Sequence, residues 1–277
     1  MKHILLALGL GLSALSMCAQ QLRTPAPSST QTIKQELGLG SVELSYSRPN
    51  VKGRKIFGDL VPFGKVWRTG ANGATTLNFT DEVTIGGTKI PAGKYGLLSI
   101  PDADSWTLII TKQLDVTSPA AYKQTEDVVR VKATAFAMKD PLETFTMQFG
   151  DIKTNSTNLY ILWANTGVSL AITTDVDTKV TAQIKSLMQD DNRPYAAAAQ
   201  YYMDNGKDLN QELAWYNKAA EQNPKAYWVL YQKASCLAKL GKKAEATVTA
   251  MKSIEVAKEA KNDDYVALNE KLLATLK

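Results

Sequence analysis

Residues 159–188 read LYILWANTGVSLAITTDVDTKVTAQIKSLM and contain the change of pattern that decides the fold. In the first half of this stretch, apolar residues occupy alternate positions: Leu159, Ile161, Trp163, Val168, Leu170 and Ile172. A period of two predicts strands with one buried face. In the second half, apolar residues recur at helical spacing behind an Asp177 or Thr178 cap: Val180, Ile184, Leu187 and Met188. The chain therefore changes from strands to helices near residue 175.

The alternating pattern extends upstream to about Thr30. Two further runs show it, one at Val42, Leu44 and Tyr46 and one at Trp106, Leu108 and Ile110. Turn residues such as Gly86-Gly87 and Pro91-Ala92-Gly93 separate the runs. About nine or ten short strands at this spacing predict an antiparallel β-sandwich or a barrel-like domain over residues 31–174.

Beyond residue 177 the pattern is helical to the end, which makes the chain a multidomain protein with an all-β part and an all-α part. Helices are predicted at about 195–205, 209–222, 225–240, 243–260 and 263–277. Two helical hairpins repeat each other at a shift of 35 residues: Ala199 and Gly206-Lys207 recur as Ala234 and Gly241-Lys242. This period resembles that of tetratricopeptide repeats, and we interpret residues 177–277 as a helical-repeat domain. A plain helical bundle is the alternative.

The first 19 residues have the pattern of a secretory signal peptide. Lys2 supplies a positive charge, an apolar run covers residues 4–15, and Met17-Cys18-Ala19 provides a cleavage site before a linker at 20–30. We therefore expect an exported protein, periplasmic or associated with the outer membrane, without a transmembrane span. Cys18 also suits a lipid anchor, but Met17 stands where a lipoprotein signal requires a smaller residue, so the cleaved form is the main expectation.

Removal of the signal would exclude several chemistries. The only histidine is His3, so a mature chain would have no histidine for a catalytic triad or a metal site. Cys236 would be the one cysteine left, which excludes an intrachain disulfide. Lys and Arg would number 31 against 27 Asp and Glu, a balance without the basic excess that nucleic-acid binding requires. No cofactor motif is present, and we expect no cofactor and no metal.

The stretch at 47–72 reads SRPNVKGRKIFGDLVPFGKVWRTGAN and is too long to be explained by strand pairing. With IPAGKY at 90–95 and the residues up to Trp163, it resembles the bacterial family called domain of unknown function 2911, whose members carry SRP-x-x-x-GR-x-x-F and VP-x-G-x-x-WR-x-G-AN segments. The resemblance implies an exported protein of the Bacteroidetes type with a β-rich domain followed by helical repeats. It implies no activity and no catalytic residue.

This stretch is also the candidate ligand site. From Arg48 to Arg68 it holds six basic residues and one acidic residue. Guanidinium groups suit a carboxylate, phosphate or sulfate, Trp67 suits a sugar or other ring, and the turn before Gly73 could hold an anion. The candidate ligand-binding residues are Arg48, Arg54, Trp67, Arg68 and Asn72. The alternative is structural: Arg68 pairs with Asp59 or Glu43, and Phe57, Phe63 and Trp67 close one end of the sandwich.

Two other features were considered as sites. The carboxylates Asp102, Asp104, Glu126 and Asp127 suit calcium or glycoside hydrolysis, but strand ends accumulate such residues for solvation alone. In the repeats, four residues fall on the expected concave face, where they would bind a protein partner: Arg193, Gln200, Trp228 and Tyr231. The alternative is that these rings pack against the β-domain.

These observations favour an exported, envelope-associated binding or scaffold protein whose repeats bind a protein partner and whose β-domain takes a small anionic or glycan ligand. One alternative is a hydrolase or lyase that acts on such a substrate at residues 48–72. Another is a purely structural envelope component. The lack of catalytic motifs favours a protein that is not an enzyme over the hydrolase or lyase.

Overall fold

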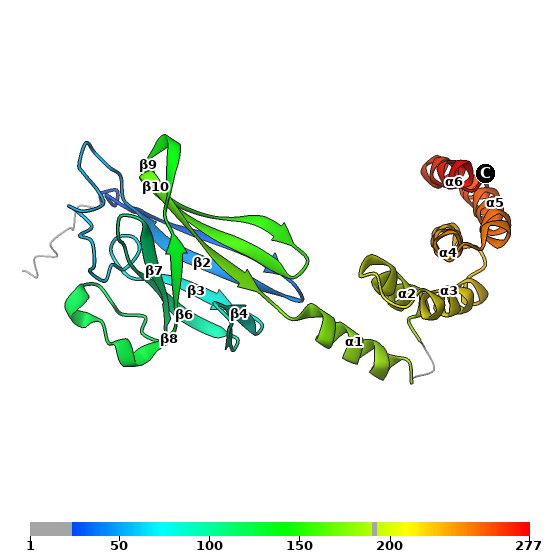
Figure 1. Cartoon of the computed structure of the whole chain (residues 1–277), viewed down its shortest axis with the longest axis horizontal. Helices are drawn as coiled ribbons and strands as arrows, with labels where there is room; N and C mark the ends of the chain where they lie inside the picture. Colours follow the sequence, from blue (N-terminus) through cyan, green and yellow to red (C-terminus); the bar gives the residue numbers. More distant parts are fainter. Residues whose placement is uncertain (1–23, 190–192) are drawn as a thin grey trace, which may run out of the picture. The chain divides into compact units, whose positions relative to one another are not determined.

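The computed structural model describes residues 24–189 and 193–277. Within them the chain forms an antiparallel β-domain followed by six α-helices, and the boundary between the two units falls after Thr174 (Figure 1). The predicted fold class is confirmed. The predicted signal at 1–19, with Cys18, lies outside the described residues.

The larger sheet has six antiparallel strands in the order β1-β2-β3-β6-β7-β8. Its strands are β1 (Ser29–Leu37), β2 (Gly40–Arg48), β3 (Thr75–Phe79), β6 (Gly93–Ile100), β7 (Ser105–Thr111) and β8 (Asp127–Thr134). Neighbouring strands of this sheet are consecutive in the sequence except for β3 and β6, because β4 and β5 belong to the other sheet. The 26-residue connection between β2 and β3 therefore leaves and re-enters the same sheet at neighbouring positions.

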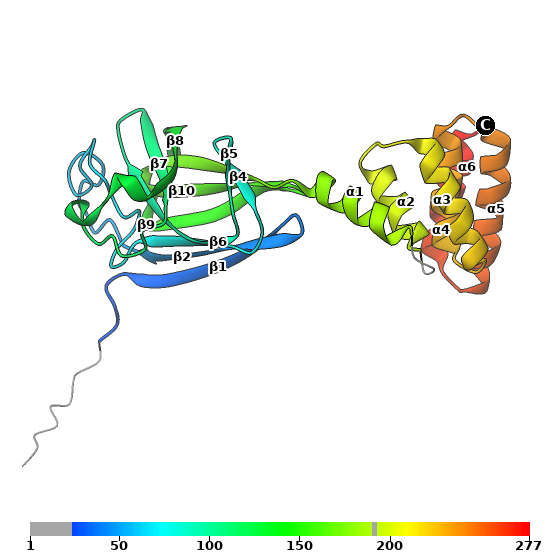
Figure 2. The same cartoon turned by 90° about the horizontal axis from the view of Figure 1, so that it is seen from below.

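The smaller sheet has four antiparallel strands in the order β5-β4-β10-β9. These are β4 (Val83–Ile85), β5 (Thr88–Ile90), β9 (Phe136–Lys153) and β10 (Ser156–Thr173). The long hairpin of β9 and β10 lies over the six-stranded sheet (Figures 1 and 2). Because the two sheets are separate, the β-domain is a sandwich and not a closed barrel.

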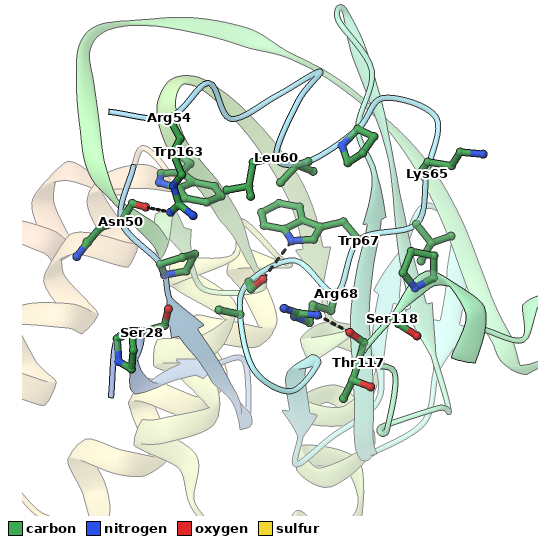
Figure 3. A pocket seen from close by; sticks show the side chains of 18 of the residues that line it. Ser28, Asn50, Arg54, Leu60, Lys65, Trp67, Arg68, Thr117, Ser118 and Trp163 are labelled. Atoms are coloured by element: carbon green, nitrogen blue, oxygen red, sulfur yellow. Dashed lines mark hydrogen bonds between the residues drawn. The ribbon is translucent and has the colours of Figure 1, made fainter. Parts of the chain in front are cut away.

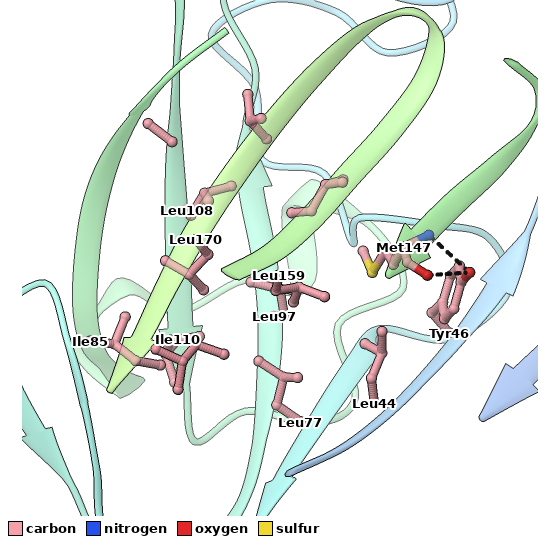
Figure 4. Close-up of a cluster of buried hydrophobic side chains, with 14 of the residues drawn as sticks. Leu44, Tyr46, Leu77, Ile85, Leu97, Leu108, Ile110, Met147, Leu159 and Leu170 are labelled. Carbon is pink, nitrogen blue, oxygen red and sulfur yellow. Dashed lines mark hydrogen bonds between the residues drawn. The ribbon is translucent and has the colours of Figure 1, made fainter. Parts of the chain in front are cut away.

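The core of the sandwich consists of the alternate side chains that both sheets turn inward (Figure 4). Leu44, Leu77 and Leu97 come from the larger sheet, and Leu159 and Leu170 come from β10. Each is at most 1% exposed, and full burial of such a side chain stabilises the fold by about 1.5–3 kcal/mol. The period-two pattern of the sequence is therefore the pattern of this inner face.

Strands β6 and β7 are buried on their outer face as well. Leu98 and Ile109 point away from the main core and pack with Val116. Val116 belongs to the connection between β7 and β8, which contains two 3₁₀ turns, Pro119–Ala121 and Gln124–Glu126. This connection covers the outer face, which explains why Ile109 is apolar at a position where alternation predicts a polar residue.

The helical unit begins with α1 (Val176–Leu187). Its cap is Asp175, whose side chain accepts a hydrogen bond from the Thr178 N–H at 3.0 Å. The predicted cap at Asp177 or Thr178 is therefore wrong. Asp177 lies in the first turn, where its carboxylate contacts Lys207 Nζ at 2.7 Å and ties α1 to the end of the next helix.

The remaining helices lie within two residues of their predicted bounds. They are α2 (Tyr195–Asp204), α3 (Leu209–Gln222), α4 (Tyr227–Lys239), α5 (Lys243–Glu259) and α6 (Asp263–Thr275). Ala199 and Ala234, the corresponding residues of the two hairpins, are both fully buried. Gly206 and Gly241 end α2 and α4 at φ 61° and 75°, the left-handed conformation that favours glycine after a helix. No helix of the described residues combines the length and the apolar character that a membrane crossing requires.

Candidate functional site

The connection between β2 and β3 closes one end of the sandwich. Near its start, Val51 N donates to Glu143 O of β9 at 2.8 Å. Near its end, Trp67 and Ser99 of β6 exchange two backbone hydrogen bonds of 2.7 and 2.9 Å. Ile56 and Val61, between these anchors, are buried. The connection is therefore bonded to both sheets, which gives its exposed side chains a fixed position.

Five aromatic rings fill this end of the domain: Phe57, Trp67, Trp106, Phe145 and Trp163. Phe57 packs edge-to-face on Trp106 with ring centroids 4.8 Å apart, and Trp67 stacks on Trp163 at 6.0 Å and 15°. Phe57 and Trp67 close the sandwich as the structural alternative predicted. Phe63 does not, because 42% of it is exposed.

A strained turn sets the direction of Trp67 and Arg68. Thr69 has φ 55°, which is unusual for a β-branched residue, and is fully buried. Its hydroxyl lies 2.9 Å from Ser99 Oγ, and Gly70 O accepts a hydrogen bond of 3.1 Å from Trp67 Nε1. Strain of this kind persists only where the surrounding contacts enforce it, and it is frequent at ligand sites.

Beside this turn lies a cavity of about 550 Å³ (Figure 3). Its cationic lining residues are Lys52, Arg54, Lys65 and Arg68. Its apolar lining consists of four prolines together with Leu60, Val61, Val66, Ala71, Trp67 and Trp163. The neutral polar lining residues are Ser28, Asn50, Thr117 and Ser118. Among the described residues none of the lining side chains is a carboxylate, so the charge that they contribute to the cavity is positive.

Arg68 is the central cation of the site. Its Nη1 donates a hydrogen bond to Thr117 O, while its Nε is buried and has no hydrogen-bond partner among the described residues. No ion pair joins Arg68 to Asp59 or Glu43 within the described part of the chain, so that predicted pairing is wrong. A buried guanidinium N–H without an acceptor is costly. The guanidinium lines the cavity, and its Nη2 is not among the buried atoms, so an anion in the cavity can bond to Nη2.

The other three cationic residues lie around the opening of the cavity. Arg54 donates to Val51 O at 3.0 Å and to Asn50 O at 2.6 Å, which holds its guanidinium on the Trp163 side of the cavity (Figure 3). Lys52 and Lys65 are exposed. Within residues 24–189 and 193–277, none of the four cations forms an ion pair. The carboxylate nearest to them in the hydrogen-bond network is that of Glu143, which accepts a bond of 2.8 Å from the Lys52 backbone N–H.

The wall opposite Trp67 comes from the connection between β7 and β8, which contributes Thr117, Ser118 and Pro119. Tyr122 and Arg130 both donate hydrogen bonds to the Asp127 carboxylate and so tie this connection to β8. Burial, followed by the hydrogen bond to Asp127, raises the pKa of Tyr122 to about 12. The phenol therefore stays protonated and keeps donating to Asp127 further into the alkaline range than an ordinary tyrosine would.

Two predicted ligand residues lie away from the cavity. Arg48 donates to Phe145 O at 3.1 Å and to Thr146 Oγ1 at 3.0 Å, so it joins β2 to β9. Asn72 donates to Ser28 O and to Ser47 Oγ, both at 3.2 Å, and so holds the start of β1 against the turn. Of the five predicted residues, the structure brings together Arg54, Trp67 and Arg68.

Sequence reasoning missed other lining residues. Lys52 and Lys65 belong to the basic stretch, so their charge could have indicated them. Nothing in a single sequence, however, distinguishes them from Lys55, which lies outside the cavity. Thr117 and Ser118 come from a connection some 50 residues downstream and had no signal. Leu60 is 45% exposed, which is unusual for a leucine in a closed turn and is visible only in the structure.

The predicted partner-binding residues of the helical unit have neighbours within that unit. Arg193 donates to Tyr195 Oη at 3.2 Å, and Gln200 Oε1 accepts from Tyr216 Oη at 3.2 Å. The Tyr231 ring packs edge-to-face on Tyr265. Trp228 remains 44% exposed.

The carboxylates considered for calcium do not form a cluster. Among the described residues, no group of three or more His, Cys, Asp or Glu side chains is placed to hold a metal ion. Asp127 instead contacts Tyr122 and Arg130.

A family model described as a protein of unknown function, DUF2911, matches residues 28–172. The chain belongs to this family. The match begins one residue before β1 and ends one residue before the end of β10, so the DUF2911 domain is the sandwich with its cavity. No curated protein and no solved structure matches the chain. The DUF2911 assignment brings no function with it.

Proposed function

We propose that this protein is an exported binding protein whose DUF2911 domain holds a small anionic ligand in the cavity beside Arg68. The observation that carries the proposal is the combination of four cations that form no ion pair and a lining without carboxylates among the described residues. Uncompensated positive charge against low-dielectric walls attracts an anion and strengthens its hydrogen bonds. We do not extend the proposal to a hydrolase or lyase, because within the described residues the lining has no carboxylate, histidine or cysteine and no hydrogen bond joins its lysines to its serines as base and nucleophile.

Isothermal titration calorimetry with phosphate, sulfate and small carboxylates, at low and high salt, tests the anion site. Arg68→Gln and Arg54→Gln each remove one charged donor and should weaken binding about 10-fold or more, because a hydrogen bond to a charged group contributes about 1.5–3 kcal/mol. Lys55→Gln is the matched control, since Lys55 belongs to the same basic stretch but does not line the cavity. Equal weakening by all three variants would mean that only the general charge of the surface matters.

For the helical unit we propose a tetratricopeptide-like array that binds a protein partner. Support comes from the 35-residue recurrence of Ala199 and Gly206 as Ala234 and Gly241, and from the exposed Trp228 on α4. Partners captured by cross-linking in the source cells should be lost from Trp228→Ala and retained by Val248→Ala, a control on the exposed surface of α5. A partner set that is the same for both variants would reject this surface.

The location is proposed from the sequence alone. If residues 1–19 are a cleaved signal, mass spectrometry of the protein from the cell envelope should find Gln20 at the N-terminus. A mature chain that begins with an acylated Cys18 would replace the cleaved form by a lipoprotein. An uncleaved chain in the cytoplasm would reject export.

A further inference from the structure

The cavity is much larger than an inorganic anion. A phosphate ion takes the space of a few water molecules of about 30 Å³ each, whereas the cavity has about 550 Å³. Ten of the lining residues have apolar side chains, and four are cationic. An oxyanion group bound to Arg68 therefore leaves room in the cavity for the rest of a larger ligand.

One side of the cavity is an apolar shelf, which we define as Leu60, Pro62, Val66 and Trp67. Leu60 and Pro62 are exposed, and Val66 and Trp67 are half-buried. In Figure 3, Leu60 and the Trp67 ring lie next to each other on the same side of the opening. Single exposed apolar residues are common on protein surfaces. Where several of them line a concave site, they indicate that an apolar part of a ligand binds there.

The shelf is flat and rigid. The Trp67 indole is stacked on Trp163 and its Nε1 is bonded to Gly70 O, so the ring cannot rotate to suit a flexible chain. A planar indole face of this kind packs best against another flat ring. Only four neutral polar side chains line the cavity, which is few for the hydroxyl groups of a sugar.

The charges flank this shelf. The Arg68 guanidinium lies on the Thr117 side of the Trp67 ring, and the Arg54 guanidinium lies on the Trp163 side (Figure 3). A ligand whose ring lies on the shelf therefore lies between two guanidinium groups that line the same cavity. Guanidinium groups take phosphate, sulfate and carboxylate alike.

We propose that the ligand is an aromatic oxyanion, in which a flat apolar ring on the shelf carries a phosphate, sulfate or carboxylate group that satisfies Arg68. This rests on the proposed function and specifies its ligand. The apolar shelf supplies affinity through burial of the ring, and the cations select for the oxyanion.

Matched pairs of probes test the ring separately from the charge. Calorimetry compares phosphate with phenyl phosphate, sulfate with phenyl sulfate, and acetate with benzoate. In at least one pair the ring should raise affinity about 10-fold or more, the factor that corresponds to burial of an aromatic side chain. Leu60→Ser should lower that ring effect about 3-fold or more and leave the affinity for the ring-free anion unchanged. Leu39→Ser is the control, because Leu39 is 58% exposed on the same domain and lies outside the cavity.

The outcomes separate the two proposals. If ring-free anions bind as tightly as their aromatic partners, the aromatic ligand is wrong and the anion site stands. If the affinity of glucose 1-phosphate exceeds that of phosphate by the same factor as the affinity of phenyl phosphate does, the part of the ligand attached to the anion is a sugar, and the proposed apolar ring is wrong. If no anion of the panel binds, the anion site itself fails. A ring effect that Leu60→Ser and Leu39→Ser reduce equally would also overturn the assignment to the shelf.

Discussion

Replacement of Glu212 by glutamine should make the helical unit more stable at neutral pH. Glu212 lies in α3 and is fully buried, and among the described residues the weak donor Cys236 Sγ is the only side-chain hydrogen-bond donor that acts on its carboxyl group. Burial raises the pKa of Glu212 above its ordinary value of 4.5, and the neighbouring Cys236 thiol and the charge of Lys239 offset this only in part. Asp204 raises the pKa further.

The sign of the effect follows from proton binding. Between pH 4.5 and the pKa of Glu212 in the folded chain, the folded state holds a proton that the unfolded state has released. The free energy of unfolding therefore falls as the pH rises through that window, by up to about 1.4 kcal/mol for each pH unit. Glutamine has nearly the same shape and does not ionise, so Glu212→Gln should remove this decline.

Urea unfolding followed by circular dichroism at 222 nm, which reports mainly on the helices, measures the effect from pH 4 to pH 8. The variant and the wild type should have similar stability near pH 4, and the variant should become progressively more stable above it. All other titrating groups are common to both proteins, so their contributions cancel in the difference. Parallel pH profiles for the two proteins would show that the Glu212 carboxyl is not held in its neutral form.

Three further predictions concern stability and reactivity. Gly86→Ala should cost about 2 kcal/mol or more of stability, because Gly86 has φ 57° and a Cβ would lie 2.5 Å from Val131 Cγ2. Gly87 also has a positive φ, but no atom lies near the position of its Cβ, so Gly87→Ala should cost less in the same denaturation assay. Tyr46→Phe should cost about 1–3 kcal/mol, because the Tyr46 hydroxyl accepts a hydrogen bond of 2.9 Å from the Met147 N–H and thereby joins β2 to β9; an unchanged urea midpoint would contradict this. Burial raises the pKa of the Cys236 thiol to about 12, so it should react with a thiol reagent at pH 8 far more slowly in the folded chain than in urea; equal rates would mean that the thiol is accessible.

The segment predicted from the sequence coincides with the cavity, whereas some of the predicted side chains do not line it. A dense run of basic residues without strand periodicity indicated residues 48–72, and the cavity lies there. Arg48 looked equivalent to Arg54, but Arg48 is still part of β2 and its guanidinium bonds to β9. The difference depends on how the strand ends relative to the second sheet, which no local pattern records.

The sequence by itself determined the division into a β-domain and a helical unit, the approximate bounds of most elements and the family, because side-chain periodicity, turn residues and motifs are local properties of the chain. Only the tertiary structure decided which side chains meet at the cavity. Thr117 reaches Arg68 because the connection between β7 and β8 packs on the outer face of the sheet through Val116. The direction of Trp67 and Arg68 depends on the strained turn at Thr69, which the contact with Ser99 enforces from another strand. Such contacts join residues far apart in the chain, and their geometry follows from packing of the whole domain.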